Sequence, residues 1–256
     1  KLRPVPAAEV EHDEPVSVRD HGEVGEEEIA QTGLAIQLLQ GATDDEVLGM
    51  VGRVVLRKPI RRGKLRPRLG RRAMAVAEAM VRQVEAELGP IDILINNAGI
   101  TRDSTFHRMS ALQWQEVINT NLNSCFNVTK PLIDSMRTRK WGRIIQIASI
   151  NGQKGQYGQA NYAASKAGMH GFTISLAQEN AKFGITVNTV SPGYVATEMV
   201  MAVPEEVRAK IEAQIPTGRL GRPDEIAYAV GFLVDEQAAW ITGANLSING
   251  GHYMGW

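Results

Sequence analysis

From residue 73 onward the chain alternates between helix-forming stretches and short apolar runs, and this alternation restricts the fold more than any other feature of the sequence. Residues 73–88 are strong helix formers with apolar side chains at helical spacing. Gly89-Pro90 ends this stretch, and Ile91-Asp-Ile-Leu-Ile95 follows as an apolar run typical of a strand buried on both faces. The pattern then predicts helices at residues 110–136, 162–182, 204–214 and 223–233, and strands at residues 142–148, 185–190 and 245–248.

Alternating strands and helices predict an α/β protein: a single doubly wound Rossmann-like domain with a parallel sheet, helices on both faces and right-handed crossovers. A length of 256 residues fits one such domain over residues 1–256, in which residues 73–256 form the catalytic portion. Ligands of these folds bind at the carboxyl ends of the strands. We therefore expect the functional residues directly after the strands.

The N-terminal third departs from this pattern. Residues 1–30 are rich in acid, whereas Arg53–Arg72 is basic and contains no acidic residue, so the net charge of zero is a cancellation. A basic run of this kind can bind nucleic acid, but a solvated or disordered segment is the commoner explanation. We therefore expect a small-molecule partner and no nucleic acid.

The composition narrows the setting further. Cys125 is the single cysteine, so the sequence predicts a buried apolar thiol, no internal disulfide and no metal site. We find neither an apolar run of about 18 residues nor the order of a signal peptide. The expected location is the cytoplasm, with no membrane partner.

One pair of residues suggests acid–base chemistry. Tyr162 and Lys166 are four residues apart at the start of a predicted helix, and this spacing puts them on one helical face. A free tyrosine titrates near pH ~10, and a nearby ammonium favours the phenolate, which suits a general acid or base. The pair alone is a weak signal. Ser149 strengthens it, because it closes the preceding strand and its hydroxyl can lie beside the phenol.

Two asparagine segments complete the pattern. Asn121 lies inside a predicted helix, where its side chain is an indifferent helix former, and Asn96-Asn97-Ala98-Gly99 follows a strand at a point where glycine permits close approach of a ligand. Together with Ser149, Tyr162 and Lys166, in this order and spacing, these residues resemble the short-chain dehydrogenase/reductase family. The resemblance runs from Ile91 to about Gly255.

The resemblance implies a role for each residue. Tyr162 donates a proton to the substrate carbonyl oxygen, which Ser149 polarises and positions. Lys166 lowers the tyrosine pKa and holds the nicotinamide ribose, and Asn121 supports a water chain that restores the proton. Cofactor contacts fall on Tyr162 and Lys166 together with a further set: Asn97, Ala98, Gly99, Pro192, Gly193 and Thr197. Residues 201–215 form a mobile lid.

Four segments are especially similar to the bacterial acetoacetyl-CoA reductases of that family: residues 99–103, 151–156, 158–162 and 191–194. This likeness implies NADPH-dependent reduction of acetoacetyl-CoA to (R)-3-hydroxybutanoyl-CoA for polyhydroxyalkanoate synthesis, by a homotetramer. The residues expected around the acyl group are Asp103, Ser149, Gln156, Tyr157, Gln159 and Tyr194. A 3-oxoacyl group on acyl-carrier protein is the alternative substrate.

The family's glycine-rich turn, which binds the cofactor pyrophosphate after an apolar strand, is not found. The nearest candidate, residues 21–25, lacks the strand and precedes three glutamates that repel a pyrophosphate. One hypothesis is a shifted reading frame over residues 1–72, since this region has about the length the family needs there. The other is a non-catalytic relative that binds no hydride donor.

Overall fold

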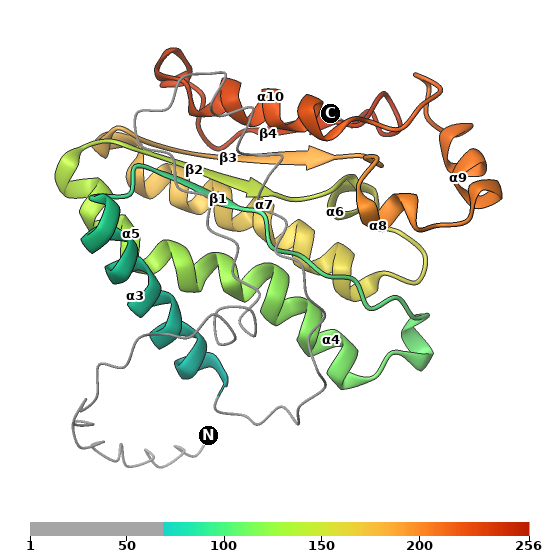
Figure 1. The fold of residues 1–256 in the computed structure, drawn as a ribbon, viewed down its shortest axis with the longest axis horizontal. Helices are drawn as coiled ribbons and strands as arrows, with labels where there is room; N and C mark the ends of the chain where they lie inside the picture. Colours follow the sequence, from blue (N-terminus) through green and yellow to red (C-terminus); the bar gives the residue numbers. More distant parts are fainter. Residues whose placement is uncertain (1–68, 256) are drawn as a thin grey trace, which may run out of the picture.

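The computed structural model describes residues 69–255, and these residues form a four-stranded parallel sheet with helices on both faces (Figure 1). The strand order is β1 (Ile93–Asn96), β2 (Gly142–Ile147), β3 (Ile185–Pro192) and β4 (Asn245–Ile248). β2 and β3 are buried along nearly their whole length, although both contain buried polar residues such as Gln146 and Asn188. The α/β class, the parallel sheet and the two helical layers are confirmed.

One face of the sheet is covered by α3 (Leu69–Leu88), α5 (Ser124–Arg139) and α7 (Ala160–Asn180). The core on this side joins the three helices to alternate residues of the strands. Its buried members include Ala77, Val81, Leu94, Val128, Leu132, Met136, Ile144, Ala177 and Val187.

The opposite face is covered by α10 (Pro223–Val234). Ile95, Ile145 and Val190, the strand residues that point away from the first core, pack there against Val230 and Leu233. Helix α10 lies above the sheet in Figure 1, whereas α5 and α7 lie below it.

We expected every crossover to be right-handed, but the last one differs from the first two. Helices α5 and α7 connect β1 to β2 and β2 to β3 on one face, but α10 connects β3 to β4 on the other, while the strand order keeps advancing in one direction. The last crossover therefore has the opposite hand to the first two. It is no simple βαβ unit, because α8 (Glu198–Met201) and α9 (Glu205–Glu212) carry the chain past the carboxyl end of the sheet before α10 begins (Figure 1).

Some element boundaries also differ from expectation. The helix predicted at residues 110–136 is α4 (Ala111–Ile118), a π-helical turn η2 (Asn119–Asn123) and α5. Helix α6 (Ile150–Lys154) was not predicted, while β4 has the predicted bounds. Short 3-10 turns lie at η1 (Phe106–Arg108), η3 (Ala181–Phe183) and η4 (Glu236–Ala238).

Within residues 69–255, no helix combines the length and apolar character needed to cross a membrane. The same residues contain no group of three or more side chains arranged to hold a metal ion. The acidic stretch, the candidate turn at residues 21–25, nearly all of the basic run and the hypothesis of a shifted frame concern residues outside the described part. The extent of the domain over residues 1–256 stays a prediction.

Candidate active site

The predicted site residues come together at the carboxyl edge of the sheet. Asn96 of β1 is in register with Gln146 of β2, and Ile147 of β2 with Val190 of β3, so the segments that follow these strands emerge side by side. The first turn of α7, which carries Tyr162, contacts the segment after β1 at the same edge.

Ser149 is fixed by its place in the chain. It is the N-cap of α6, in extended conformation, and its Oγ accepts a hydrogen bond from Asn151 N at 3.1 Å. Such a cap satisfies one of the free N–H groups at a helix start, which explains a serine at this point. The hydroxyl also hydrogen-bonds the Tyr162 phenol.

Lys166 is almost completely buried one turn after Tyr162 on α7. Its Nζ donates a hydrogen bond to Ile147 O at 2.7 Å and lies 5.7 Å from the centroid of the Tyr162 ring. Burial lowers the pKa of Lys166 to about 8, against a smaller opposite effect of the Cys125 thiol. Cys125 is buried, as predicted, and burial raises the pKa of this thiol to about 11.

Burial raises the pKa of Tyr162, and the hydrogen bond with Ser149 opposes this rise. The nearby Asp103 and Tyr194 raise it further. The expected lowering of this pKa by Lys166 stays a prediction.

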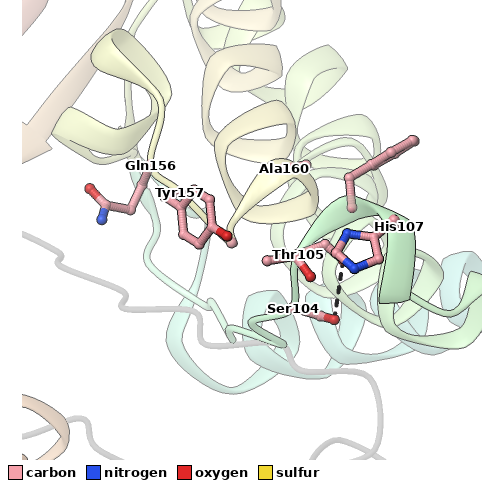
Figure 2. A pocket seen from close by; sticks show the side chains of 8 residues that line it. Ser104, Thr105, His107, Gln156, Tyr157 and Ala160 are labelled. Carbon is pink, nitrogen blue, oxygen red and sulfur yellow. Dashed lines mark hydrogen bonds between the residues drawn. The ribbon is translucent and has the colours of Figure 1, made fainter.

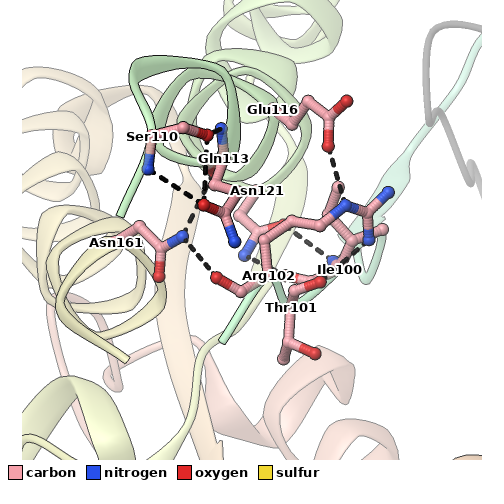
Figure 3. Close-up of polar contacts among 8 residues, drawn as sticks. All are labelled: Ile100, Thr101, Arg102, Ser110, Gln113, Glu116, Asn121 and Asn161. Atoms are coloured by element: carbon pink, nitrogen blue, oxygen red, sulfur yellow. Dashed lines mark hydrogen bonds and ion pairs between the residues drawn. The ribbon is translucent and has the colours of Figure 1, made fainter. Parts of the chain in front are cut away.

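Asn121 is fully buried in the π-helical turn. Its Oδ1 accepts from Ile100 N at 2.8 Å, and its Nδ2 donates to Ile100 O at 3.0 Å (Figure 3). The same Nδ2 donates to Ser165 Oγ at 3.1 Å. Both amide hydrogens are therefore used to hold the segment after β1 against α7. Ser165 was not predicted as part of the site, and the water chain through Asn121 stays a prediction.

The residues expected at the cofactor surround this edge. Asn97 and Gly99 are exposed after β1, Pro192 and Gly193 are partly exposed at and just after the end of β3, and Thr197 is exposed. A Cβ at Gly99 would lie 3.4 Å from Lys166 Nζ. Glycine at position 99 thus keeps the approach to the ammonium open. Ala98, between them, is partly exposed.

Gly193 has a packing reason to be glycine. A Cβ there would come within 2.8 Å of the Asn249 Cβ, and Gly193 N donates to Ile248 O at 2.9 Å. The glycine at this position is required by the turn after β4, independently of any ligand.

Lys166 meets the chemical requirement for holding a ribose. Within the described residues its ammonium makes one hydrogen bond, whereas an ammonium has three donor hydrogens. Two donors are thus available to hydroxyl oxygens beside Tyr162. The nearest candidate for a phosphate-binding turn, residues 21–25, falls outside the described residues.

Three of the residues expected around the acyl group lie close to Tyr162. Asp103 and Tyr194 both influence its pKa, and Gln159 Nε2 donates to Asp103 Oδ2 at 2.8 Å. Asn151, which was not predicted as a contact, donates from Nδ2 to Gln159 Oε1 at 2.9 Å. The Tyr194 ring stacks on His252, with centroids 5.7 Å apart.

Gln156 and Tyr157 line an open pocket of about 450 Å³ next to this group (Figure 2). Tyr162 and Asp103 do not line it. Its other lining residues are Ser104, Thr105, Phe106, His107, Gly158 and Ala160. The expected lid, residues 201–215, contains α9, and a bridge between Val195 and Gly221 closes the base of the larger loop to which it belongs.

Comparisons with known proteins agree with this geometry. A family model described as enoyl-(acyl carrier protein) reductase matches residues 72–253. An acetoacetyl-CoA reductase of Allochromatium vinosum is 57% identical over 175 residues, which are 68% of this chain and 71% of that protein. The chain belongs to the short-chain dehydrogenase/reductase family. It is an oxidoreductase of the kind that uses a nicotinamide cofactor.

Further relatives in this family carry two different names. An acetoacetyl-CoA reductase of Cupriavidus necator is 57% identical over 68% of this chain and 70% of its own length. A 3-oxoacyl-acyl-carrier-protein reductase of Escherichia coli is 51% identical over 70% of this chain and 74% of its own length. The family match begins at residue 72, earlier than Ile91, where we placed the start of the resemblance.

Proposed function

We propose that this chain reduces acetoacetyl-CoA to (R)-3-hydroxybutanoyl-CoA with NADPH in the cytoplasm, as a step of polyhydroxyalkanoate synthesis. One observation carries the proposal: Ser149, Tyr162 and Lys166 converge at the carboxyl edge of the sheet, with Asp103 and Tyr194 beside the phenol. The chain that has this arrangement is 56–59% identical to acetoacetyl-CoA reductases over their matched lengths.

In the proposed reaction the Tyr162 hydroxyl gives a proton to the substrate carbonyl oxygen, to which Ser149 donates a hydrogen bond. A raised pKa keeps the phenol protonated at neutral pH, and this is the form that a general acid needs. The bound nicotinamide supplies the hydride that the carbonyl carbon receives. Lys166, Asn97, Ala98, Gly99, Pro192, Gly193 and Thr197 would hold the nicotinamide half of that cofactor.

The acyl group would lie among Asp103, Gln159 and Tyr194. The pocket with Gln156 and Tyr157 begins directly beside this group, because two of its lining residues, Ser104 and Gly158, are the chain neighbours of Asp103 and Gln159. Ser104 N donates a hydrogen bond to Gly158 O at 2.8 Å. This continuity supports a substrate that extends beyond the acetoacetyl group, as a CoA or carrier-protein thioester does.

The first test is NADPH oxidation with acetoacetyl-CoA, followed by the nicotinamide absorbance, for the wild-type chain and for Tyr162→Phe. We expect activity in the wild type and its loss in the variant, with NADPH binding retained. If the wild-type chain neither oxidises nor binds NADPH, the reductase proposal fails in favour of a non-catalytic relative that lacks the phosphate-binding turn.

A 3-oxoacyl-acyl-carrier-protein reductase is the second candidate, favoured by the relative from Escherichia coli. Comparing kcat/KM for CoA and carrier-protein thioesters of the same acyl group separates the two. A larger kcat/KM with the carrier-protein thioester would replace the first proposal by the second. The same assay with NADH in place of NADPH tests the cofactor preference.

We also propose a homotetramer. Large apolar side chains are exposed in two regions that face different directions: Leu112, Trp114, Phe126 and Ile174 on α4, α5 and α7, and Tyr228, Phe232 and Trp240 on and after α10. Apolar surface in two places supports two kinds of subunit contact. Light scattering after size-exclusion chromatography measures the mass, and a monomer would refute this part.

A further inference from the structure

We infer that Asn161 is a positioning residue that fixes the segment Ile100–Asp103 against the first turn of α7, and so sets where Asp103 lies relative to Tyr162. The inference rests on the proposed function. Asn161 has no exposed surface, so it does not touch substrate and is not a catalytic residue.

The side chain of Asn161 uses both ends of its amide. Nδ2 donates to Arg102 O at 3.1 Å and to Gln113 O at 3.2 Å (Figure 3). Oδ1 accepts from Tyr162 N at 2.8 Å. One buried amide thus joins the loop after β1, the helix α4 and the backbone of the proposed acid. Removing it leaves three part-buried backbone groups without this partner, which is costly.

An asparagine at this point has a local cause. The first N–H groups of a helix lack partners within the helix, and Tyr162 N is one of these groups in α7. The N-cap residue Gln159 provides no side-chain cap, because its amide is bonded to Asp103 and Asn151. Asn161 takes over the capping of Tyr162 N from inside the first turn.

Three amides hold consecutive parts of the same short segment. Asn121 bonds Ile100, Asn161 bonds Arg102 O, and Gln159 bonds the carboxylate of Asp103. Of these three, Asn161 is the one that also bonds the backbone of Tyr162. Asn161 therefore connects the segment that ends at Asp103 directly to the backbone of Tyr162.

The Arg102 side chain strengthens this connection. Its Nε donates to Glu116 Oε2 at 2.7 Å on α4, and its Nη1 donates to Thr101 O at 2.8 Å. Arg102 is thus held at its backbone by α7 and at its side chain by α4, as Figure 3 shows. Without Asn161 the backbone support is lost, and the segment is held mainly from the side of α4.

The test compares Asn161→Ala with Asn180→Ala. Asn180 is a matched control, since it is also a buried asparagine of α7 with two hydrogen bonds, to Leu176 O and from Arg137, but it lies at the far end of the helix. We expect kcat for acetoacetyl-CoA reduction to fall about 10- to 100-fold in Asn161→Ala, since small misplacements of reacting groups have effects of this size. In Asn180→Ala we expect a lower Tm and a kcat within about twofold of wild type.

Asn161→Asp provides a second variant of nearly the same shape. It keeps the acceptor for Tyr162 N–H, but its second oxygen faces Arg102 O and Gln113 O, which accept and do not donate. The protonated acid donates one of these bonds, so its kcat relative to wild type should rise as the pH falls. A role in stability alone gives no such rise.

A readout independent of activity separates this inference from the proposed function. Backbone hydrogen exchange in residues 100–103 should be faster in Asn161→Ala than in wild type and unchanged in Asn180→Ala. If the wild-type chain is inactive, the proposed function fails and hydrogen exchange alone judges the role of Asn161. Equal exchange in all three proteins, or an equal fall of kcat in both alanine variants, would overturn the inference.

Discussion

Adding one methyl group at Gly152 should disturb the site without removing any polar group. Gly152 lies in α6, three residues after Ser149, and a Cβ there would come within 2.8 Å of the Lys166 carbonyl carbon and 2.9 Å of Ala167 N. Ordinary contacts of a Cβ begin at 3.4 Å, so the backbones of α6 and α7 must separate by about 0.6 Å. Backbone atoms cannot turn aside as a flexible side chain can.

This separation acts between the element capped by Ser149 and the helix that carries Tyr162 and Lys166. Overpacking of this kind costs about 1–3 kcal/mol of unfolding free energy. A misplacement of 1 Å between reacting groups reduces rates about 100-fold, so a separation somewhat above half that size should lower kcat about 10-fold. We therefore expect Gly152→Ala to lower both Tm and kcat.

Gly171→Ala is the matched control. Gly171 lies in α7, where a Cβ would have no neighbour within 4 Å, and alanine is the better helix former by about 1 kcal/mol. This variant should keep kcat and gain in Tm. The assays are thermal unfolding and the rate of NADPH oxidation with acetoacetyl-CoA. If Gly152→Ala has the Tm and kcat of wild type, the close contact of α6 and α7 does not set the geometry of the site.

Three further predictions concern single side chains. Ser149→Ala should lower kcat about 100- to 1000-fold, which is the effect of losing one donor to a reacting oxygen. It should also lower the unfolding free energy by about 1 kcal/mol, because the α6 cap is lost. An unchanged kcat would exclude Ser149 from the reaction. Hydrogen bonds from Arg219 and Arg222 lower the pKa of Glu225 to about 2, so the stability due to its charge is present above pH 4.5 and lost as the pH falls toward 2. Over this range the Tm of Glu225→Gln should fall less than that of wild type. Parallel Tm curves would contradict the contribution of these hydrogen bonds. Burial lowers the pKa of Lys166 to about 8 from 10.5, so the folded chain releases this proton at a lower pH than the unfolded chain and gains stability as the pH rises between these values. The unfolding free energy of wild type minus that of Lys166→Met should therefore rise over this interval. A constant difference would mean that Lys166 does not titrate there.

The sequence predicted the strands well because burial on both faces leaves a simple signature. β2 and β3 are buried along nearly their whole length, and β4 has the predicted bounds. The π-helical turn at Asn119–Asn123 was missed because a changed backbone bonding pattern over one turn hardly alters the periodicity of the side chains. Helix α6 has five residues and includes Gly152, so it has neither the length nor the propensity that pattern analysis needs.

The hand of the last crossover could not be derived from the sequence. The rule for right-handed crossovers concerns a strand, one connection and a neighbouring strand. Here α8 and α9 intervene and the chain returns on the opposite face with α10, whose apolar residues would fit either side equally well as a pattern. Only the packing of Val230 and Leu233 on Ile145 and Val190 decides the face.

The site was predicted in its reactive members and missed in its supports. Ser149, Tyr162 and Lys166 follow strands or open a helix at family spacing. Asn161 and Ser165 instead act through contacts with residues 59 and 44 positions away in the sequence, and Asn151 bonds Gln159. Burial, which the spacing of Tyr162 and Lys166 does not reveal, is the largest cause of the raised pKa of Tyr162.

These supports also indicate which groups remain for ligands. Asn121 and Asn161 each use both amide hydrogens within the chain, so neither side chain has a donor left for substrate, cofactor or water. Lys166 keeps two donors and Tyr162 its hydroxyl. Because donors fixed in advance act most strongly on a developing charge, the groups expected to meet the reacting oxygen are Tyr162 and Ser149, with Lys166 beside them. We expect Lys166, whose ammonium can donate a proton, to return one to Tyr162, while Asn121 holds Ile100 and Ser165 in place.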